Sequence, residues 1–142
     1  MSPVFRGKTG NSFAGFLMHV LSVDKVNDLY DRNICHVGPA FARAVLKDLG
    51  VSYEIENPEI LDMLPEGPFI TISNHPYGSI DGLMLVDIFG HLRTDYKVMV
   101  NRFLGRIEPL QGNFICVTPT GKTRTAPTDD SIMGVKEAMR HV

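Results

Sequence analysis

The chain has 142 residues, the length of one domain, and 44% of them are hydrophobic, which is enough to build a core. Its formal net charge of −2 leaves no surplus of basic residues, so the composition argues against a nucleic-acid-binding protein. No apolar run reaches the roughly 18–20 residues that a membrane-spanning helix requires. Cys35 and Cys116 are isolated and lack metal-ligand spacing, so they indicate core packing or a reducing compartment.

Helical periodicity dominates the first fifty residues. A first helix is predicted from apolar residues at helical spacing, namely Phe13, Phe16, Leu17, Val20 and Leu21. This apolar face either packs on the domain or meets a membrane surface. Two more helices are predicted, one over 23–32 with Ser22 as its cap and one over 39–49 that ends at Gly50. We therefore expect an N-terminal helical segment over residues 1–50.

The remainder of the chain alternates between strand and helix patterns. Strands are predicted where β-branched and aromatic residues cluster, at 51–55, 69–73, 96–100 and 114–117. Helices are predicted at 58–63, at 80–90, at 102–106 and from Asp130 or Ser131 onward. A strand–helix–strand series implies parallel pairing with a right-handed crossover. We therefore expect an α/β fold, with helices first and a mainly parallel sheet in an α/β core over residues 51–142, within one structural domain.

A histidine and an aspartate stand where the strand predicted at 69–73 gives way to the helix predicted at 80–90. Ligands of open α/β sheets bind at the carboxyl ends of strands, which makes this turn the candidate site. His75 suits a general base, and Asp81 would hold its ring across a turn that Gly78 allows. Plainer interpretations stay open, because a first-turn aspartate commonly interacts with the helix dipole and a loop histidine commonly lies at the surface.

The nine residues 74–82, Asn-His-Pro-Tyr-Gly-Ser-Ile-Asp-Gly, resemble the first signature block of the glycerolipid acyltransferases, the PlsC-type or lysophosphatidic acid acyltransferase superfamily. They are most similar to the haemolysin-like branch, which includes the acyltransferases of ornithine and glycine lipids. Five residues separate the histidine from the aspartate, as in that branch, and Ser79 replaces a glycine. The likeness runs from about Leu21 onward, with a weaker second block at 97–101 and 107–110.

This resemblance implies acyl transfer with His75 as the general base and Asp81 as the residue that orients it. The hydroxyl or amine of the acceptor would attack an acyl thioester directly, without a covalent enzyme intermediate. The substrate-binding residues that the resemblance implies are Asn74, Gly78, Ser79, Asn101 and Arg102. Arg102 would bind a phosphate or carboxylate, although a solvated surface arginine is an equally good interpretation of it.

The resemblance also implies the partners. The acyl donor would be acyl-carrier protein or acyl-CoA, with no other cofactor, and the acceptor would be a lysophospholipid or an amino-acid lipid. The histidines have no metal-ligand spacing with carboxylates or cysteines, so no metal is expected. Because both substrates carry acyl chains, the protein would be cytoplasmic and bound peripherally to the inner face of the cell membrane. The family's third block, built around proline and glycine, is not found before Val142, so the chain is expected to be truncated.

Two other functions stay open. A catalytically inactive truncated domain would keep the fold and bind lipid or acyl-carrier protein without turnover. A hydrolase would use Ser73 or Ser79 as a nucleophile beside His75, although neither serine stands in the Gly-x-Ser-x-Gly context of a nucleophile elbow. A trapped acyl-serine would separate these classes, because direct transfer forms none.

Overall fold

The structure is a computed structural model that describes residues 23–118 and 129–142. Two compact units make up the chain, residues 1–35 and residues 36–142, and each is described by itself. The helix predicted over 13–21 lies outside the described residues, and so does most of the polar loop that precedes the last helix.

The described part of the first unit contains one helix, α2 (Val23–Asn33), which confirms the helix predicted over 23–32. Asp24 in its first turn and Arg32 in its last turn complement the partial charges of the helix ends. The side-chain amide of Asn33 donates to the backbone oxygen of Leu29, one turn earlier, at 2.8 Å, so the buried side chain is satisfied within its own helix.

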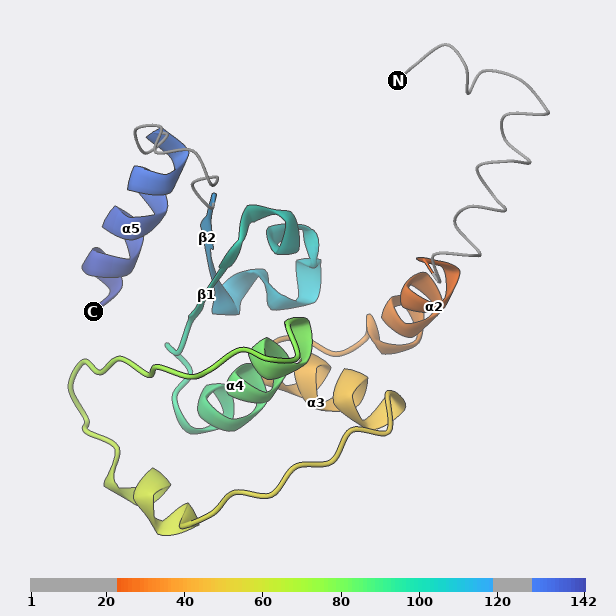
Figure 1. Cartoon of the computed structure of the whole chain (residues 1–142), viewed down its shortest axis with the longest axis horizontal. Helices are drawn as coiled ribbons and strands as arrows, with labels where there is room; N and C mark the ends of the chain where they lie inside the picture. The colour runs from red at the N-terminus through yellow and green to blue at the C-terminus, as the bar shows by residue number, and fades with distance from the viewer. Residues whose placement is uncertain (1–22, 119–128) are drawn as a thin grey trace. The chain divides into compact units, whose positions relative to one another are not determined.

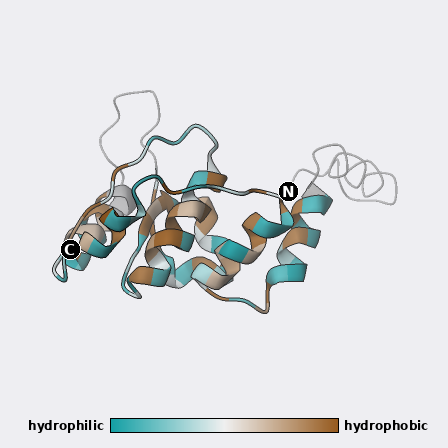
Figure 2. Ribbon diagram, turned by 90° about the horizontal axis from the view of Figure 1, so that it is seen from below, coloured by the Kyte–Doolittle hydropathy of each residue, from teal (hydrophilic) through white to brown (hydrophobic). Residues whose placement is uncertain are grey.

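Two helices, α3 (Pro39–Asp48) and α4 (Ser79–Leu92), pack side by side in the second unit (Figure 1). α3 buries the apolar face formed by Phe41, Ala42, Val45 and Leu46. The two helices approach closely at Gly90, where an added Cβ would lie 2.6 Å from Cγ of Pro39. The helices of the structure carry both hydrophobic and hydrophilic residues (Figure 2), and α3 is amphipathic, as expected for a helix that is buried on one side.

The sheet of the described residues consists of two parallel strands, β1 (Val98–Asn101) and β2 (Phe114–Val117), in a register that pairs Val98 with Phe114. Two 3₁₀-helices connect them, η3 (Arg102–Arg106) and η4 (Glu108–Asn113). Leu110 of η4 is fully buried and forms part of the core. These elements confirm the α/β class, the strand at 114–117 and the short helix at 102–106, and they shift the strand predicted at 96–100 by two residues at its start.

A last helix, α5 (Asp129–His141), lies against β2 (Figure 1) and confirms the predicted final helix. Gly134 makes the closest approach, because an added Cβ would lie 2.5 Å from the backbone oxygen of Cys116. The C-terminal end of α5 is attached separately, since Nε2 of His141 lies 2.6 Å from the backbone oxygen of Asp95. Because that oxygen only accepts, the imidazole nitrogen is the donor.

Two predicted strands are wrong. Residues 51–55 and 69–73 are extended but belong to no sheet, and the long connection between α3 and α4 passes through η2 (Pro58–Met63), which confirms the predicted short helix (Figure 1). Other contacts hold these stretches in place. The Tyr53 hydroxyl donates a hydrogen bond to Asp87 of α4, and the Thr71 hydroxyl shares one with the hydroxyl of Tyr96. Alternation at 51–55 and β-branched residues at 69–73 favour extended chain, but neither pattern supplies the partner strand that a ladder of hydrogen bonds needs. The burial expected of the strand at 69–73 is also wrong, because Ile70 and Ile72 are exposed.

The predicted strand–helix–strand unit is wrong for the same reason. The parallel partner of β1 is β2, and the connection between them runs through η3 and η4 instead of through α4. The stretch 69–73 therefore approaches α4 as unpaired extended chain. Its position at the start of the candidate site makes this a feature of the site as well as of the fold.

Replacing Gly134 by alanine should destabilise the second unit by about 1–3 kcal/mol, because the new methyl group would overlap the backbone of β2. Urea unfolding followed by circular dichroism measures the change. Gly82 in α4 provides the matched control, since nothing lies within 4 Å of an added Cβ there. Alanine at 82 should stabilise by about 0.5–1 kcal/mol through helix propensity alone. Equal effects at both positions would contradict the packing of α5 on β2.

Candidate functional site

The candidate site is built on the turn that leads into α4. Residues 76–78 form the turn, and Gly78 stands at the N-cap of α4 with φ of +65°. Nothing lies within 4 Å of a Cβ added to Gly78, so the backbone conformation, and not a lack of space, favours glycine here. This agrees with the backbone role predicted for Gly78. Asn74 and Ser79 are exposed on either side of the turn.

The turn brings His75 and Asp81 together. Nδ1 of His75 lies 3.4 Å from Oδ2 of Asp81, and the same oxygen accepts a hydrogen bond from the backbone N–H of Tyr77 at 2.8 Å. The Asp81 side chain is 14% exposed and the His75 side chain 64% exposed. The carboxylate is therefore fixed and largely covered, while the imidazole beside it is open to solvent.

This arrangement has a clear chemical capacity. A carboxylate beside Nδ1 favours the tautomer with its proton on Nδ1, which leaves Nε2 able to accept a proton from a bound molecule. The separation of 3.4 Å is longer than an ideal hydrogen bond, and catalytic contacts of this kind are commonly loose without substrate. Asp81 also stands in the first turn of α4, where the positive end of the helix dipole stabilises its charge.

Two further predicted residues lie at the carboxyl end of β1. Oδ1 of Asn101 accepts a hydrogen bond from the backbone N–H of Phe103 at 3.0 Å, so this side chain caps η3. Arg102 is exposed at the first position of η3. The described contacts that hold His75 and Asp81 come from the turn itself. A role of Asn101 and Arg102 in substrate binding stays a prediction.

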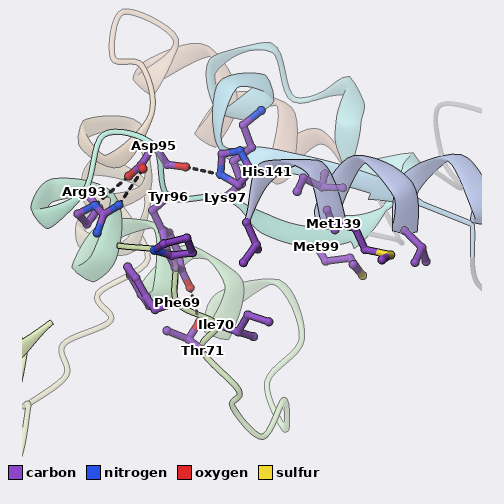
Figure 3. Close-up of a pocket in the computed structure, with 15 residues that line it drawn as sticks. Phe69, Ile70, Thr71, Arg93, Asp95, Tyr96, Lys97, Met99, Met139 and His141 are labelled. Carbon is purple, nitrogen blue, oxygen red and sulfur yellow. Dashed lines mark hydrogen bonds and ion pairs between the residues drawn. The ribbon is translucent and has the colours of Figure 1, made fainter. Parts of the chain in front are cut away.

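A cavity of about 560 Å³, which the sequence did not predict, is lined in part by the extended stretch that precedes this turn (Figure 3). Its apolar walls come from three separate elements, the extended stretch 68–71, the sheet residues Met99 and Ile115, and α5 through Val135 and Met139. Such a cavity depends on how distant elements pack, which residue spacing does not encode. Thr71, at its edge, is only four residues before His75.

An aromatic cluster holds the extended stretch in place. The ring of Phe69 is stacked on that of Tyr96 with centroids 6.2 Å apart, and Phe89 of α4 lies 5.0 Å from Tyr96. The hydroxyls of Thr71 and Tyr96 share a hydrogen bond at 2.7 Å. Burial raises the pKa of the Tyr96 hydroxyl, so it stays neutral. These contacts fix the chain that leads into the turn.

Charged residues close one side of the cavity. Arg93 donates two hydrogen bonds to Asp95, at 3.0 Å and 2.9 Å, and its guanidinium lies 5.3 Å from the centre of the Phe69 ring. The hydrogen bond from Arg93 is the main reason why the pKa of the Asp95 carboxyl is lowered. The same bond raises the pKa of Arg93. This pair keeps its opposite charges paired at the surface.

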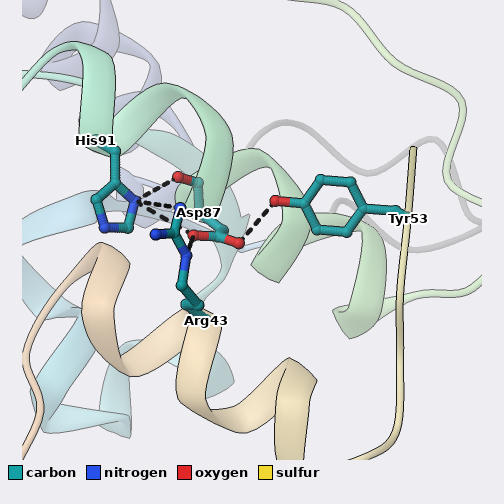
Figure 4. A network of polar contacts seen from close by, with 4 residues as sticks. All are labelled: Arg43, Tyr53, Asp87 and His91. Atoms are coloured by element: carbon teal, nitrogen blue, oxygen red, sulfur yellow. Dashed lines mark hydrogen bonds and ion pairs between the residues drawn. The ribbon is translucent and has the colours of Figure 1, made fainter. Parts of the chain in front are cut away.

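A second polar network surrounds Asp87, further along α4 (Figure 4). Its buried carboxylate accepts hydrogen bonds from Nε of Arg43 at 2.9 Å and from the hydroxyl of Tyr53 at 2.7 Å. Nδ1 of His91 lies 3.2 Å from the carboxylate and 2.6 Å from the backbone oxygen of Asp87, so this nitrogen carries a proton. The network joins α3 and the extended stretch 51–55 to the helix that carries Asp81.

Two absences concern only the described residues. Within 23–118 and 129–142, no group of three or more His, Cys, Asp or Glu side chains is placed to hold a metal ion. No helix in the part of the chain that the structure describes is both long enough and apolar enough to cross a membrane.

Comparison with known proteins places this site in a family. The sequence pattern of the acyltransferase family matches residues 11–137, which is most of the chain, and the chain therefore belongs to that family. The chain is 32% identical over 108 residues to a lyso-glycine lipid O-acyltransferase of Phocaeicola vulgatus. It is 28% identical over 108 residues to a protein of the same name from Bacteroides thetaiotaomicron. No solved structure matches the chain.

The matches cover most of this chain but less than half of each relative. Each covers 75% of this chain but only 38% of the Phocaeicola protein and 39% of the Bacteroides protein. The chain thus spans about two fifths of the length of the curated relatives that it matches. The predicted resemblance to the glycerolipid and glycine-lipid acyltransferases is confirmed, and the class of enzyme that the turn at 74–82 indicated is the class of the family.

The Asp87 network generates a pH-dependent prediction. Burial, followed by the hydrogen bond to Asp87 and its negative charge, raises the pKa of the Tyr53 hydroxyl to about 12 from its ordinary 10.0. A raised pKa contributes stability that is complete below pH 10.0 and is lost as the pH rises toward about 12. Tyr53→Phe should therefore destabilise the protein by about 1–2 kcal/mol near neutral pH, and this difference should shrink above pH 10.0.

Urea unfolding of both proteins at a series of pH values measures that difference. Tyr77→Phe, at an exposed tyrosine, is the control and should leave the free energy of unfolding unchanged over the same range. The free energies of unfolding of Tyr53→Phe and of the unsubstituted protein could instead differ by a constant amount as the pH rises to about 12. That result would show that Tyr53 is not held by the buried carboxylate.

Proposed function

We propose that the chain carries the site of an enzyme that transfers a fatty acyl group from acyl-carrier protein or acyl-CoA to a lipid acceptor. The observation that carries this proposal is the pairing of His75 with the fixed carboxylate of Asp81. Membership of the acyltransferase family and the name of the two relatives, lyso-glycine lipid O-acyltransferase, support a lipid hydroxyl as the acceptor. A lysophospholipid and a lyso-glycine lipid are therefore the acceptors to test.

In the proposed reaction, Nε2 of His75 takes the proton of the acceptor hydroxyl as its oxygen attacks the thioester carbonyl carbon. Asp81 stabilises the imidazolium that forms. The tetrahedral intermediate then collapses, the carbon–sulfur bond breaks, and His75 returns the proton to the leaving sulfur. The products are an O-acyl lipid and a free thiol. Asn74, which directly precedes His75, and the backbone N–H groups of the turn bind the oxyanion of the intermediate. No cofactor besides the thioester takes part.

The remaining predicted residues have supporting roles in this proposal. Gly78 and Ser79 shape the entry to α4, and Asn101 and Arg102 bind the polar part of a substrate. Because the acceptor is a lipid, the enzyme acts as a peripheral protein at the inner face of the cell membrane, with the apolar residues of 13–21 as one contact.

Replacing His75 by alanine should lower the rate of acyl transfer by about 10²–10⁴-fold, the usual contribution of a general base. The assay follows free thiol released from an acyl thioester in the presence of a lyso-glycine lipid or a lysophospholipid. Circular dichroism of the variant should be unchanged, since the His75 side chain is 64% exposed. Release of thiol at an equal rate by the variant would contradict the proposal. No release by the unsubstituted chain would favour a lipid-binding domain without turnover.

Two substitutions of Asp81 separate its charge from its hydrogen bond. Asn at 81 keeps an oxygen that can accept from the N–H of Tyr77, while it removes the negative charge beside His75. We expect Asp81→Asn to keep the stability of the protein and to lose about 10²–10⁴-fold in transfer rate. Asp81→Ala should lose both activity and about 1 kcal/mol of stability. Full activity of Asp81→Asn would show that Asp81 has only a structural role.

Mass spectrometry of the protein during turnover tests the alternative of a serine nucleophile. Direct transfer predicts no acylated Ser73 or Ser79, and replacing either serine by alanine should leave an activity that still depends on His75. An acyl group trapped on one of these serines would overturn direct transfer in favour of a hydrolase-like mechanism.

A further inference from the structure

The connection between α4 and β1, residues 93–96, is fixed along its whole length. The backbone N–H of Arg93 donates to a carbonyl in the last turn of α4 at 2.8 Å. The side-chain amide of the buried Asn113 donates to the backbone oxygen of Tyr96 at 3.1 Å. Between these two points, the imidazole of His141 donates to a further backbone oxygen at 2.6 Å. The connection therefore holds a fixed position relative to α4, the helix that carries the candidate carboxylate.

This connection holds the chain that leads into the candidate site at three successive points. The guanidinium of Arg93 donates to the backbone oxygen of Pro65 at 2.8 Å. The ring of Tyr96 is stacked on that of Phe69 (Figure 3). The hydroxyl of Tyr96 shares a hydrogen bond of 2.7 Å with the hydroxyl of Thr71 (Figure 3). The three contacts follow one another along the chain toward the turn.

The hydroxyl pair is the last of these attachments before His75. Residues 72–76 are all exposed, so among the described residues the side-chain bond of Thr71 is the one nearest to His75 on its amino side. Four residues of extended chain span about 13 Å at most. On the other side of His75, the backbone N–H of Tyr77 bonds to Asp81 itself. The imidazole thus lies between a bond to the α4–β1 connection and a bond to α4.

We infer that Thr71 and Tyr96 are positioning residues that set the distance between His75 and Asp81. Their hydroxyl bond fixes the chain from which His75 enters the turn, whereas Asp81 is carried by α4, from which the connection continues. Loss of this bond would therefore release the chain of His75 and leave Asp81 in place. The separation of 3.4 Å leaves little tolerance, because a shift of about 1 Å removes a contact of this kind. The consequence for acyl transfer rests on the proposed function, but the contact between the two side chains does not.

The tautomer of His75 measures its position without any substrate. A carboxylate beside Nδ1 keeps the proton on that nitrogen, whereas a free imidazole side chain favours the proton on Nε2. Nitrogen-15 NMR of the imidazoles at about pH 9, where histidine is ordinarily neutral, distinguishes the two forms, and His75→Ala identifies the signal. In Tyr96→Phe, which keeps the stacked ring and removes only the hydroxyl, we expect the His75 signal to shift toward the Nε2–H form.

Two further variants make this measurement specific. Thr71→Val removes the other half of the bond and should give the same shift, and the double variant should shift no further than either substitution alone. Tyr53→Phe is the matched control, because it also removes a tyrosine hydroxyl bonded to a side chain of the same unit. It should lower stability and leave the His75 tautomer unchanged. An unchanged tautomer in Tyr96→Phe and Thr71→Val would overturn the inference. So would an equal shift in Tyr53→Phe, because any loss of stability would then displace His75.

The rate of thiol release supplies the second readout. Tyr96→Phe should lower kcat about three- to tenfold, as expected for one lost hydrogen bond, and should leave KM unchanged. In an Asp81→Asn background the same substitution should cause no further loss, because the pair that it positions is already broken. A further loss of the same size would contradict the inference. A protein that shows the tautomer shift but releases no thiol would count against the proposed function and would still support the positioning of His75.

Discussion

One carboxylate oxygen organises the candidate site. Oδ2 of Asp81 accepts the N–H of Tyr77 and faces Nδ1 of His75, so the bond that closes the turn is also the contact that orients the imidazole. The turn exists because Gly78 adopts a positive φ at the N-cap of α4. Loss of the glycine conformation would displace the carboxylate and the histidine together. Backbone geometry, helix capping and proton chemistry therefore depend on the same few atoms.

α4 is held firmly enough to serve as the carrier of that oxygen. Asp87, six residues after Asp81, receives hydrogen bonds from Arg43 of α3 and from Tyr53 of the extended stretch that follows it. Gly90 brings α3 and α4 into close contact on the next turn. A buried carboxylate is stable only when its oxygens are satisfied, so these partners are a requirement for burying Asp87 at all. The result is a rigid helix whose exposed end presents the site.

The sequence predicted well those features that depend on local spacing. The five residues between His75 and Asp81, with a glycine among them, were enough to place the pair at a helix start, and apolar periodicity was enough for α2, α3, α4 and α5. The strands predicted at 51–55, from alternation, and at 69–73, from β-branched residues, are wrong because such patterns favour an extended chain without specifying its neighbour. Instead of pairing in a sheet, Phe69 and Thr71 contact Tyr96 through ring stacking and a hydrogen bond. Tyr53 likewise donates a hydrogen bond to Asp87.

The same limit explains the two features of the site region that sequence reasoning missed. The cavity between 68–71, the sheet and α5 depends on segments that are far apart in the sequence. In the Asp87 network, His91 has the i,i+4 spacing of a helical pair, but Arg43 and Tyr53 lie far from Asp87 in the sequence and no spacing marks them.

The exposure of His75 sets a requirement on the proposed chemistry. A thioester held beside a solvated general base would be lost to hydrolysis, because water competes with the acceptor for the same proton transfer. The described residues leave the imidazole 64% exposed, so something other than these residues must exclude water during transfer.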